Sequence, residues 1–121
     1  MTLSKKKYRY IGIYLSSRLS SNKAGILEKL SNRYLGLFGS IDYSNANIRI
    51  IEIKDIPNSI VILKCRLESL TNILISMNLI DLELMVVSIS GTLKQLKKKI
   101  LAFLDYVSEN QKDLTFNFKD S

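Results

Sequence analysis

Histidine is absent from this 121-residue sequence, and cysteine occurs only once, as Cys65. The lack of histidine removes the most common general base and the most common metal ligand. A single cysteine can form neither a disulfide within the chain nor a cysteine-based metal cluster, and it fits a reducing compartment. We therefore predict a non-catalytic, cytoplasmic protein with no metal or cofactor of its own, in which Cys65 is a small buried residue.

Proline occurs once and glycine five times, while 46% of the residues are hydrophobic and 24% are charged. This balance is typical of a globular protein and argues against extended disorder. No apolar run approaches the roughly 18 residues of a membrane span, so we expect a soluble protein. The length suits one domain over residues 1–121, with a basic arm at 1–7 and a tail at 109–121. Within that tail, Leu114–Phe118 fits an edge strand and a loose end equally well.

Acidic residues are scarce in two segments of the chain. Residues 1–33 hold eight lysines and arginines against one acid, a net charge of +7, and residues 84–100 hold four lysines and no acid, a net charge of +4. Residues 34–83 and 101–121 each carry a net charge of −2, so the four segments sum to the overall +7. This concentration of positive charge favours a polyanionic partner or an acidic surface.

The hydrophobic pattern predicts an α+β protein with a βαββαβ order and an extra C-terminal helix. Strands are expected over four ranges: 8–15, 48–53, 60–65 and 82–89. Helices are expected over three ranges: from Asn22 to Gly39, around 70–77, and from about 92 to 107. Two crossovers around a hairpin correspond to the ferredoxin-like, RNA-recognition-motif-like fold with a four-stranded antiparallel sheet.

Both faces of two predicted strands are apolar, although a sheet with one solvated face would alternate apolar and polar residues. On residues 60–65, one face holds Val61, Leu63 and Cys65, and the other holds Ile60 and Ile62. On residues 82–89, Leu84 and Val86 oppose Met85, Val87 and Ile89. We therefore predict that the first two helices cover one face and that the last helix covers the other.

The segment Ser90-Gly91-Thr92 opens the last predicted helix. Thr92 and Gln95 have the spacing of a capping box. Gly91 allows a ligand to approach the backbone, and the positive helix end favours an anion there. Three lysines share a face away from the apolar stripe: Lys94, Lys97 and Lys98. Phosphate binding and an ordinary solvated helix face explain this pattern equally well.

Two further groups of cations could contact phosphate. The N-terminal arm contributes Lys5, Lys6, Lys7 and Arg9. Such an arm gains affinity for any nucleic acid by counterion release, although a solubilising tail is an equal alternative. Lys64 and Arg66 share one face at the end of a buried strand, where either phosphate or a surface ion pair could engage them.

Three tyrosines, Tyr8, Tyr10 and Tyr14, share one face of the first strand with Gly12. Aromatic residues on the sheet stack on bases in RNA recognition motifs. However, residues 60–65 lack the aromatic positions of that motif. Packing in a core or interface is therefore the preferred interpretation of the tyrosines, with Gly12 making room for a helix across the sheet.

Four short segments match a known pattern: Arg9-Tyr10-Ile11, Leu35-Gly36-Leu37-Phe38-Gly39, Lys64-Cys65 and Val87-Ser88-Ile89-Ser90-Gly91-Thr92-Leu93-Lys94. Over residues 6–104 the chain resembles the archaeal ribonuclease P protein component 2 family, known in eukaryotes as the Pop-five type subunit. The last segment is the most specific. The family often has a histidine and a basic residue after the cysteine, where this chain has Leu67 and Glu68.

The resemblance implies a non-catalytic subunit of archaeal ribonuclease P, whose catalytic RNA uses Mg²⁺ to remove the 5′ leader of precursor tRNA. The implied partners are that RNA, precursor tRNA and a TIM-barrel-like component 3 subunit. The resemblance also implies that the two proteins form a two-plus-two heterotetramer and that no membrane is involved. We expect twelve RNA-binding residues: Lys5, Lys6, Lys7, Arg9, Lys64, Arg66, Ser90, Gly91, Thr92, Lys94, Lys97 and Lys98.

Two other functions remain open from the sequence. A small-molecule regulatory domain of ferredoxin-like fold is the main alternative, although such a domain needs no basic arm. An acylphosphatase-like enzyme would need a phosphate-binding loop with an arginine after the first strand. Arg18 is available for that role, but the residues that follow it do not resemble such a loop.

Overall fold

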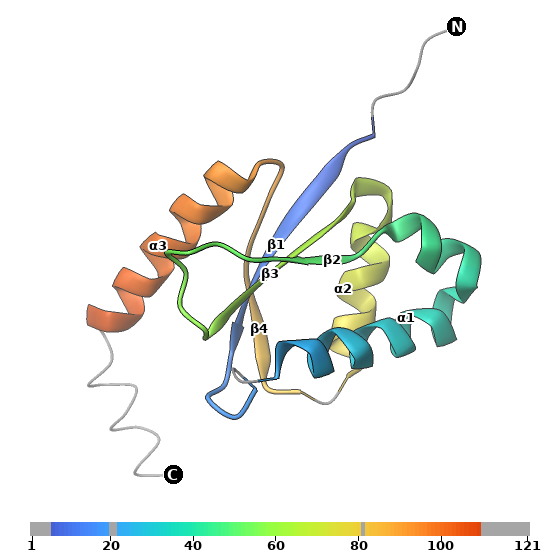
Figure 1. Ribbon diagram of the computed structural model, residues 1–121, viewed down its shortest axis with the longest axis horizontal. Coiled ribbons are helices and arrows are strands. Elements are labelled where there is room, and N and C mark those ends of the chain that lie inside the picture. Colours follow the sequence, from blue (N-terminus) through green and yellow to red (C-terminus); the bar gives the residue numbers. More distant parts are fainter. Residues whose placement is uncertain (1–5, 20–21, 81, 110–121) are drawn as a thin grey trace, which may run out of the picture.

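The computed structural model describes residues 6–19, 22–80 and 82–109. Within these ranges the chain forms a four-stranded antiparallel sheet with helices on both faces (Figure 1). The elements in chain order are β1 (Tyr8–Leu15), α1 (Lys23–Ala46), β2 (Arg49–Ile51), β3 (Ile60–Arg66), the 3₁₀ turn η1 (Leu67–Ser69), α2 (Leu70–Asn78), β4 (Leu84–Ser90) and α3 (Leu93–Glu109). The strand order β2-β3-β1-β4 confirms the predicted ferredoxin-like topology with an additional C-terminal helix.

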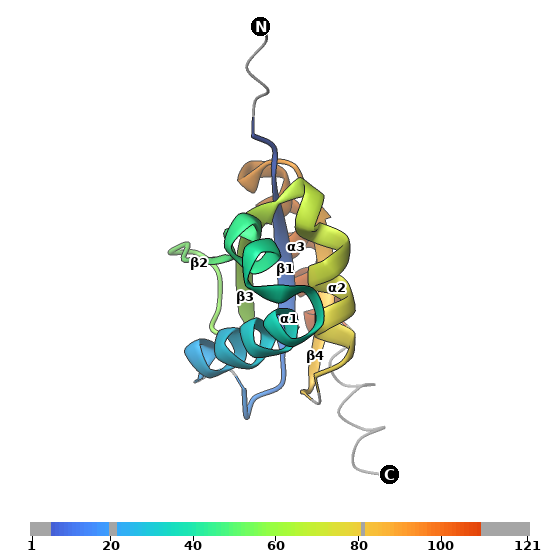
Figure 2. The ribbon, with the colours of Figure 1, turned by 90° about the vertical axis from the view of Figure 1, so that its right-hand side faces the viewer.

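The sheet separates two hydrophobic cores, because alternate residues of its central strands point to opposite faces. The first core lies against α1 and α2 and includes Ile11, Ile13, Val61, Leu63 and Cys65. The second core lies against α3 and includes Ile60, Ile62, Leu96 and Ile100. Figure 2 shows α3 on the opposite side of the sheet from α1 and α2. The predicted covering of both sheet faces is therefore confirmed.

Gly12 marks the point where α3 crosses β1. A Cβ atom at this position would lie 3.0 Å from Cδ1 of Ile100 and 3.5 Å from Cδ1 of Leu96. Further along β1, the rings of Tyr14 and Phe103 meet edge to face with centroids 5.4 Å apart. The glycine allows α3 to pack closely on the sheet, as predicted, and Tyr14 belongs to the second core.

A β-bulge in β4 corrects one predicted assignment. Gly12 pairs with Ser88, but Ile13 pairs with Val86, so Val87 is the extra residue. Because an extra residue reverses the alternation of faces, Ile89 packs in the first core together with Leu84 and Val86. Its predicted place beside Met85 and Val87 was therefore wrong.

Helix α1 is longer than predicted and contains a break at Gly39. Asn22 caps its start, because the Gly25 N–H donates to Asn22 Oδ1 at 3.1 Å. Gly39 leaves the helical conformation with φ 89° and ψ 168°, and the helix then resumes to Ala46. The second part is held by contacts with the first: Tyr34 donates to Asp42, and its ring lies 6.0 Å from that of Tyr43.

Strand β2 covers only Arg49–Ile51 of the predicted 48–53. It pairs with β3 in the expected antiparallel hairpin, while Ile53 and Ile56 leave the ladder to pack in the second core. Residues 110–121, including the alternating Leu114–Phe118, lie outside the described residues. Among the helices of the described ranges, none combines the length and apolarity that a bilayer crossing requires.

Candidate nucleic-acid interface

Cations from distant segments meet at the end of the sheet where β1 begins. Arg49 is opposite Lys64, Lys64 is opposite Tyr10, and Tyr10 is opposite Ser90, so one row of residues crosses all four strands. Tyr8 is opposite Arg66 in the adjacent row. Directly opposed residues in antiparallel strands share a face. We call this end, with the start of α3, the basic end: Lys6, Lys7, Tyr8, Arg9, Tyr10, Arg49, Lys64, Arg66, Ser90, Gly91, Thr92 and Lys94.

The start of α3 carries half of the predicted capping box. The Gln95 N–H donates to Thr92 Oγ1 at 3.2 Å, and the Leu96 N–H donates to the Thr92 carbonyl at 3.1 Å. No Gln95 side-chain bond back to Thr92 accompanies them in the described part of the chain. The backbone N–H groups of Leu93 and Lys94 have no hydrogen-bond partner among the described residues, so they are available to an anion.

Arg9 lies beside Gly91 at this helix start. A Cβ atom on Gly91 would lie 3.4 Å from Nη1 of Arg9, an ordinary contact distance, and Gly91 does not have a positive φ. Neither packing nor backbone conformation therefore requires glycine here. Nη1 also donates to the Tyr8 carbonyl at 2.8 Å, which holds the guanidinium next to the exposed backbone of Gly91. The start of α3 therefore combines the fixed guanidinium of Arg9 with accessible backbone N–H groups.

Two buried polar atoms of the basic end have no hydrogen-bond partner among the described residues. They are Oγ of Ser90, a residue that is only 5% exposed, and Nε of Arg66. Buried polar groups in folded proteins are normally satisfied by protein or water. These two atoms can therefore take an oxygen atom of a ligand or of water. Another guanidinium nitrogen of Arg66 forms an ion pair with Glu68.

Lys64 lies over the tyrosines of β1. Its Nζ is 4.5 Å from the ring centroid of Tyr8 and 5.8 Å from that of Tyr10. A cation–π contact at an exposed site contributes only about 0.5–1 kcal/mol. Tyr10 and Tyr14 pack against the second core, as the sequence predicted, but Tyr8 belongs to neither core. Tyr10 and Tyr14 therefore contribute to core packing, whereas Tyr8 lies outside both cores.

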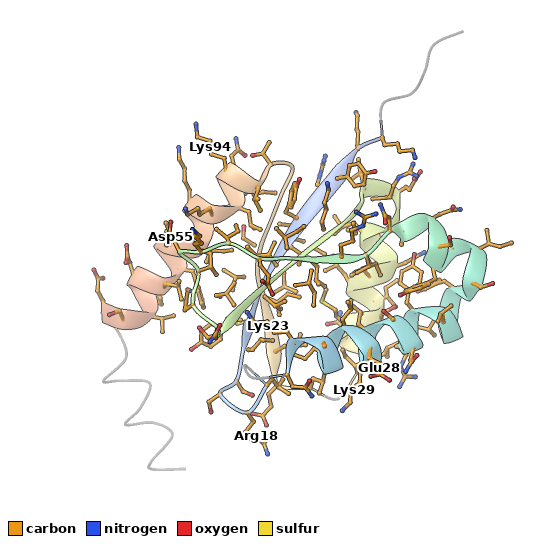
Figure 3. The ribbon with its side chains drawn as sticks, in the orientation of Figure 1. Arg18, Lys23, Glu28, Lys29, Asp55 and Lys94 are labelled. Carbon is orange, nitrogen blue, oxygen red and sulfur yellow. The ribbon has the colours of Figure 1, made fainter. Side chains whose placement is uncertain are left out.

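The three α3 lysines occupy different environments. Lys94 and Lys98 are exposed, and Figure 3 shows Lys94 at the start of α3. Lys97 is half-buried, and its Nζ lies 3.1 Å from Oδ2 of Asp55 in the β2–β3 loop. Lys99 reaches the Ile89 carbonyl at 3.4 Å. Lys97 is therefore already engaged with an acid, which distinguishes it from its two predicted companions.

The N-terminal arm is attached to the basic end at Lys7. Its carbonyl accepts a hydrogen bond from the Leu67 N–H at 2.9 Å, directly after β3. The side chains of Lys6 and Lys7 are exposed, while Lys5 lies outside the described residues. The arm therefore leaves the sheet next to Arg66.

Arg49 belongs to the basic end but was not predicted to bind RNA. It is exposed, and its Nε donates to Oδ1 of Asn47 at 3.1 Å. Its position follows from its pairing with Lys64. The exact register of the β2–β3 hairpin would have identified Arg49 as a neighbour of Lys64. That register depends on where β2 ends.

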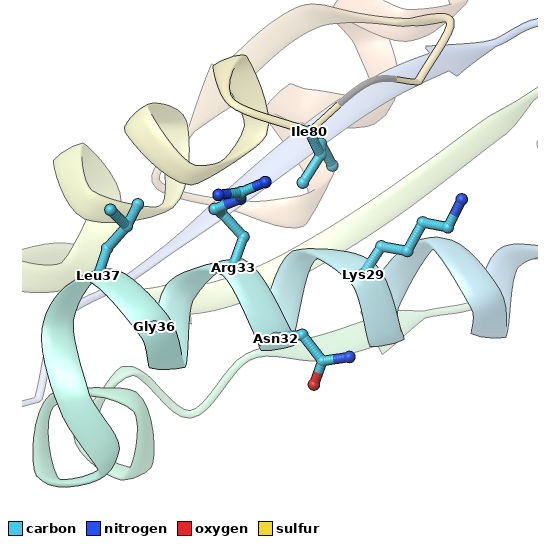
Figure 4. Close-up of a pocket in the computed structure, with 6 residues that line it drawn as sticks. All are labelled: Lys29, Asn32, Arg33, Gly36, Leu37 and Ile80. Atoms are coloured by element: carbon cyan, nitrogen blue, oxygen red, sulfur yellow. The ribbon is translucent and has the colours of Figure 1, made fainter.

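Arg18 lies at the opposite end of β1 (Figure 3). It is exposed and forms an ion pair with Glu83. An open groove of about 440 Å³ lies between α1 and Ile80. Figure 4 shows Lys29, Arg33 and Leu37 pointing from α1 towards this space. Neither Arg18 nor the groove adjoins the basic end.

Cys65 is fully buried in the first core. Burial raises the pKa of its thiol from 9.0 to about 11, although the nearby charge of Arg9 opposes the shift. The thiol is therefore neutral at physiological pH and unsuited to act as a nucleophile or metal ligand. In the described ranges, no group of three or more histidine, cysteine, aspartate or glutamate side chains could hold a metal ion.

The fold and this end of the sheet define a ferredoxin-like α+β protein with a concentrated cationic surface. The sequence profile of the Rpp14/Pop5 family matches residues 8–101, from the start of β1 into α3. The chain therefore belongs to the Rpp14/Pop5 family. The matched range includes each strand that the structure describes and the Ser90-Gly91-Thr92 segment.

One similar solved structure is a chain from the cryo-EM structure of yeast ribonuclease MRP. It superposes with a TM-score of 0.52 at 10% sequence identity, and the match covers 94% of this chain and 98% of that chain. At this identity the similarity concerns the fold alone. The curated proteins contain no match to the sequence.

Proposed function

We propose that this chain is a non-catalytic protein subunit of a ribonuclease P ribonucleoprotein. In this role it binds the catalytic RNA and supports removal of the 5′ leader from precursor tRNA. The observation that carries the proposal is the convergence of Arg9, Lys64 and Lys94 at one end of the sheet in a member of the Rpp14/Pop5 family. The similarity to a chain of yeast ribonuclease MRP agrees with this assignment.

The basic end would act by neutralising phosphates. A phosphate at the start of α3 would meet the available N–H groups and the Arg9 guanidinium. Lys64 and Arg49 would contact the same RNA further across the sheet, and Lys94 on the side of α3. Each contact releases counterions, so it contributes affinity without reading the base sequence.

The catalytic step belongs to the RNA in this proposal. Mg²⁺ bound by the RNA supplies the chemistry, while this chain positions and stabilises the folded RNA. We also propose that the chain acts in the cytoplasm with a TIM-barrel-like component 3 subunit, in a two-plus-two heterotetramer.

Reconstitution tests the proposal directly. The purified chain is mixed with ribonuclease P RNA and precursor tRNA in Mg²⁺, with and without the partner subunit, and the released leader is measured. We expect no cleavage by the protein alone and faster cleavage by the RNA when both proteins are present. Absence of any stimulation, together with absence of binding to the RNA, would overturn the proposal.

A further inference from the structure

Helix α3 covers only part of its face of the sheet. Tyr10 packs against the second core, Leu96 and Ile100 lie over Gly12, and Phe103 contacts Tyr14, so the helix side covers β1 from Tyr10 onward. Figure 1 shows α3 running away from the N-terminal end of β1. Tyr8, at that end, is half-buried and belongs to neither core. Among the described residues, the Tyr8 ring is therefore partly accessible within the basic end, with only the Lys64 ammonium group placed over it.

We propose that this uncovered part of the sheet binds an unpaired nucleotide, whose base stacks on Tyr8 and whose phosphate contacts Lys64. This inference rests on the proposed function and specifies the RNA structure that the basic end recognises. The target is a single-stranded segment, bulge or loop, and not a continuous duplex.

The surroundings of Tyr8 favour a nucleotide. Lys64 Nζ lies 4.5 Å from the ring centroid, and Arg66 is directly opposite Tyr8 across the β1–β3 ladder. A flexible lysine can exchange its weak contact with the ring for a phosphate while a base takes its place on the ring. Bases stack on aromatic side chains whatever their identity, because each has a π face. One nucleotide would thus stack its base on the Tyr8 ring and place its phosphate against the Lys64 ammonium group.

The occupant must be unpaired for a geometric reason. In an A-form duplex the bases stack on one another, and the deep major groove is too narrow for side chains to read. Tyr8 is the first residue of β1 and is half-buried, so its ring offers a face for stacking and does not project as a wedge between base pairs. A base that has left the stack can lie flat against the ring.

The test compares Tyr8→Leu with Tyr8→Phe in the full chain. The probes are a short single-stranded RNA containing 2-aminopurine and a blunt duplex of the same sequence, and anisotropy and 2-aminopurine fluorescence are measured. We expect Tyr8→Leu to weaken binding to the single strand by about 5- to 140-fold and to abolish the 2-aminopurine quenching. Tyr8→Phe should bind like wild type, and binding to the duplex should be unchanged for both variants.

Two further variants separate stacking from charge. Tyr106→Leu removes a tyrosine that is 63% exposed on α3 and should change neither affinity nor quenching. Lys64→Met should lower the salt slope for the single strand by about 0.7, the value for one phosphate contact, whereas Tyr8→Leu should leave the slope unchanged. Circular dichroism and urea unfolding establish that each variant is folded.

The outcomes distinguish this inference from the proposed function. If wild type binds both RNAs and Tyr8→Leu leaves the single-strand affinity unchanged, the nucleotide site is wrong and the proposed function stands. An equal loss on the duplex would also overturn the site. If wild type binds neither short RNA, the nucleotide site is wrong, and the reconstitution with ribonuclease P RNA decides the proposed function separately. An unchanged RNA affinity accompanied by loss of partner-subunit binding would assign Tyr8 to a protein contact instead.

Discussion

Cys65 illustrates how the position of one residue determines its chemistry. It lies opposite Arg9 in the β1–β3 ladder, and its side chain is fully buried in the first core. The buried site disfavours the charged thiolate, and this effect outweighs the attraction of Arg9, so the pKa rises to about 11. The folded protein therefore keeps Cys65 as a neutral thiol.

This shift predicts how stability depends on alkaline pH. The folded protein keeps the Cys65 proton up to about pH 11, whereas the unfolded chain loses it near pH 9.0. Between these values the unfolded state binds fewer protons, so the free energy of unfolding should fall as the pH rises. Urea unfolding over this window measures the fall. Cys65→Ala should be less stable at neutral pH and should show a shallower decline.

Tyr34 acts in the same direction, because burial and its hydrogen bond to Asp42 raise its pKa. Some decline should therefore persist in Cys65→Ala. A wild-type stability that stays constant between pH 9.0 and about 11 would contradict the assignment of a buried, neutral thiol.

Lys97 shows what residue spacing can and cannot predict. Its position at i+3 from Lys94 correctly placed both residues on a helix, but the spacing contains no information on Asp55, which lies 42 positions earlier. Arg49 was missed for a similar reason, since its neighbour Lys64 comes from another strand. At this scale, cations can be found in the sequence, but their partners depend on the tertiary fold.

Two glycines of α1 offer a matched comparison of helical elements. Gly36 and Gly39 are both exposed, and a Cβ atom on either would meet nothing within 4 Å. They differ in backbone conformation: only Gly39 has a positive φ, and its φ of 89° with ψ of 168° is a region used almost exclusively by glycine. The same substitution should therefore have opposite effects at the two positions.

We predict that Gly36→Ala raises the free energy of unfolding by about 0.5–1 kcal/mol, because alanine favours the helix and orders the unfolded chain. Gly39→Ala should lower it by about 1–3 kcal/mol, because alanine is strained in that conformation. Urea unfolding of the two variants, with unchanged m values, provides the measurement. Effects of the same sign would mean that the break at Gly39 does not exist in solution.

The order and type of the elements were predictable, whereas several of their details were not. Alternation and three- to four-residue spacing identified the four strands and three α-helices of the described ranges. The continuation of α1 beyond Gly39 depends on contacts of Asp42 and Tyr43 with Tyr34, which no local pattern contains. The bulge at Val87 likewise arises from pairing with β1, and it reversed the predicted face of Ile89.

At the scale of the whole molecule, positive charge lies at both ends of the sheet, but only one end combines it with the start of α3. Figure 3 places Lys94 at that end and Arg18, Lys23 and Lys29 at the other. The topology explains this arrangement, because β1 begins where β3 and β4 end. Two basic segments far apart in the sequence are thereby brought together.

This arrangement predicts that the position of charge, and not its total, controls RNA binding. One triple variant removes cations of the basic end and the adjacent turn of α3: Lys64→Ala, Lys94→Ala and Lys98→Ala. The control removes the same charge from α1: Lys23→Ala, Lys29→Ala and Arg33→Ala. The first should reduce the slope of log K against log salt by roughly 0.7–0.9 for each phosphate that the protein no longer neutralises.

Binding titrations with ribonuclease P RNA at several salt concentrations measure both slopes. The control variant should retain a slope close to that of wild type. Equal reductions in the two variants would indicate that the RNA is attracted by net charge alone, and the basic end would then have no special role.

The bulge at Val87 also affects how the sheet can associate. In the described part of the chain, β2 and β4 are the outer strands, and an outer strand can recruit a strand from another molecule. Here β2 is only three residues long and β4 is bent by the bulge. Both features hinder the addition of a further strand, so the folded chain is protected from edge-to-edge aggregation. Helices and loops are therefore the more accessible surfaces for a second copy in an assembly.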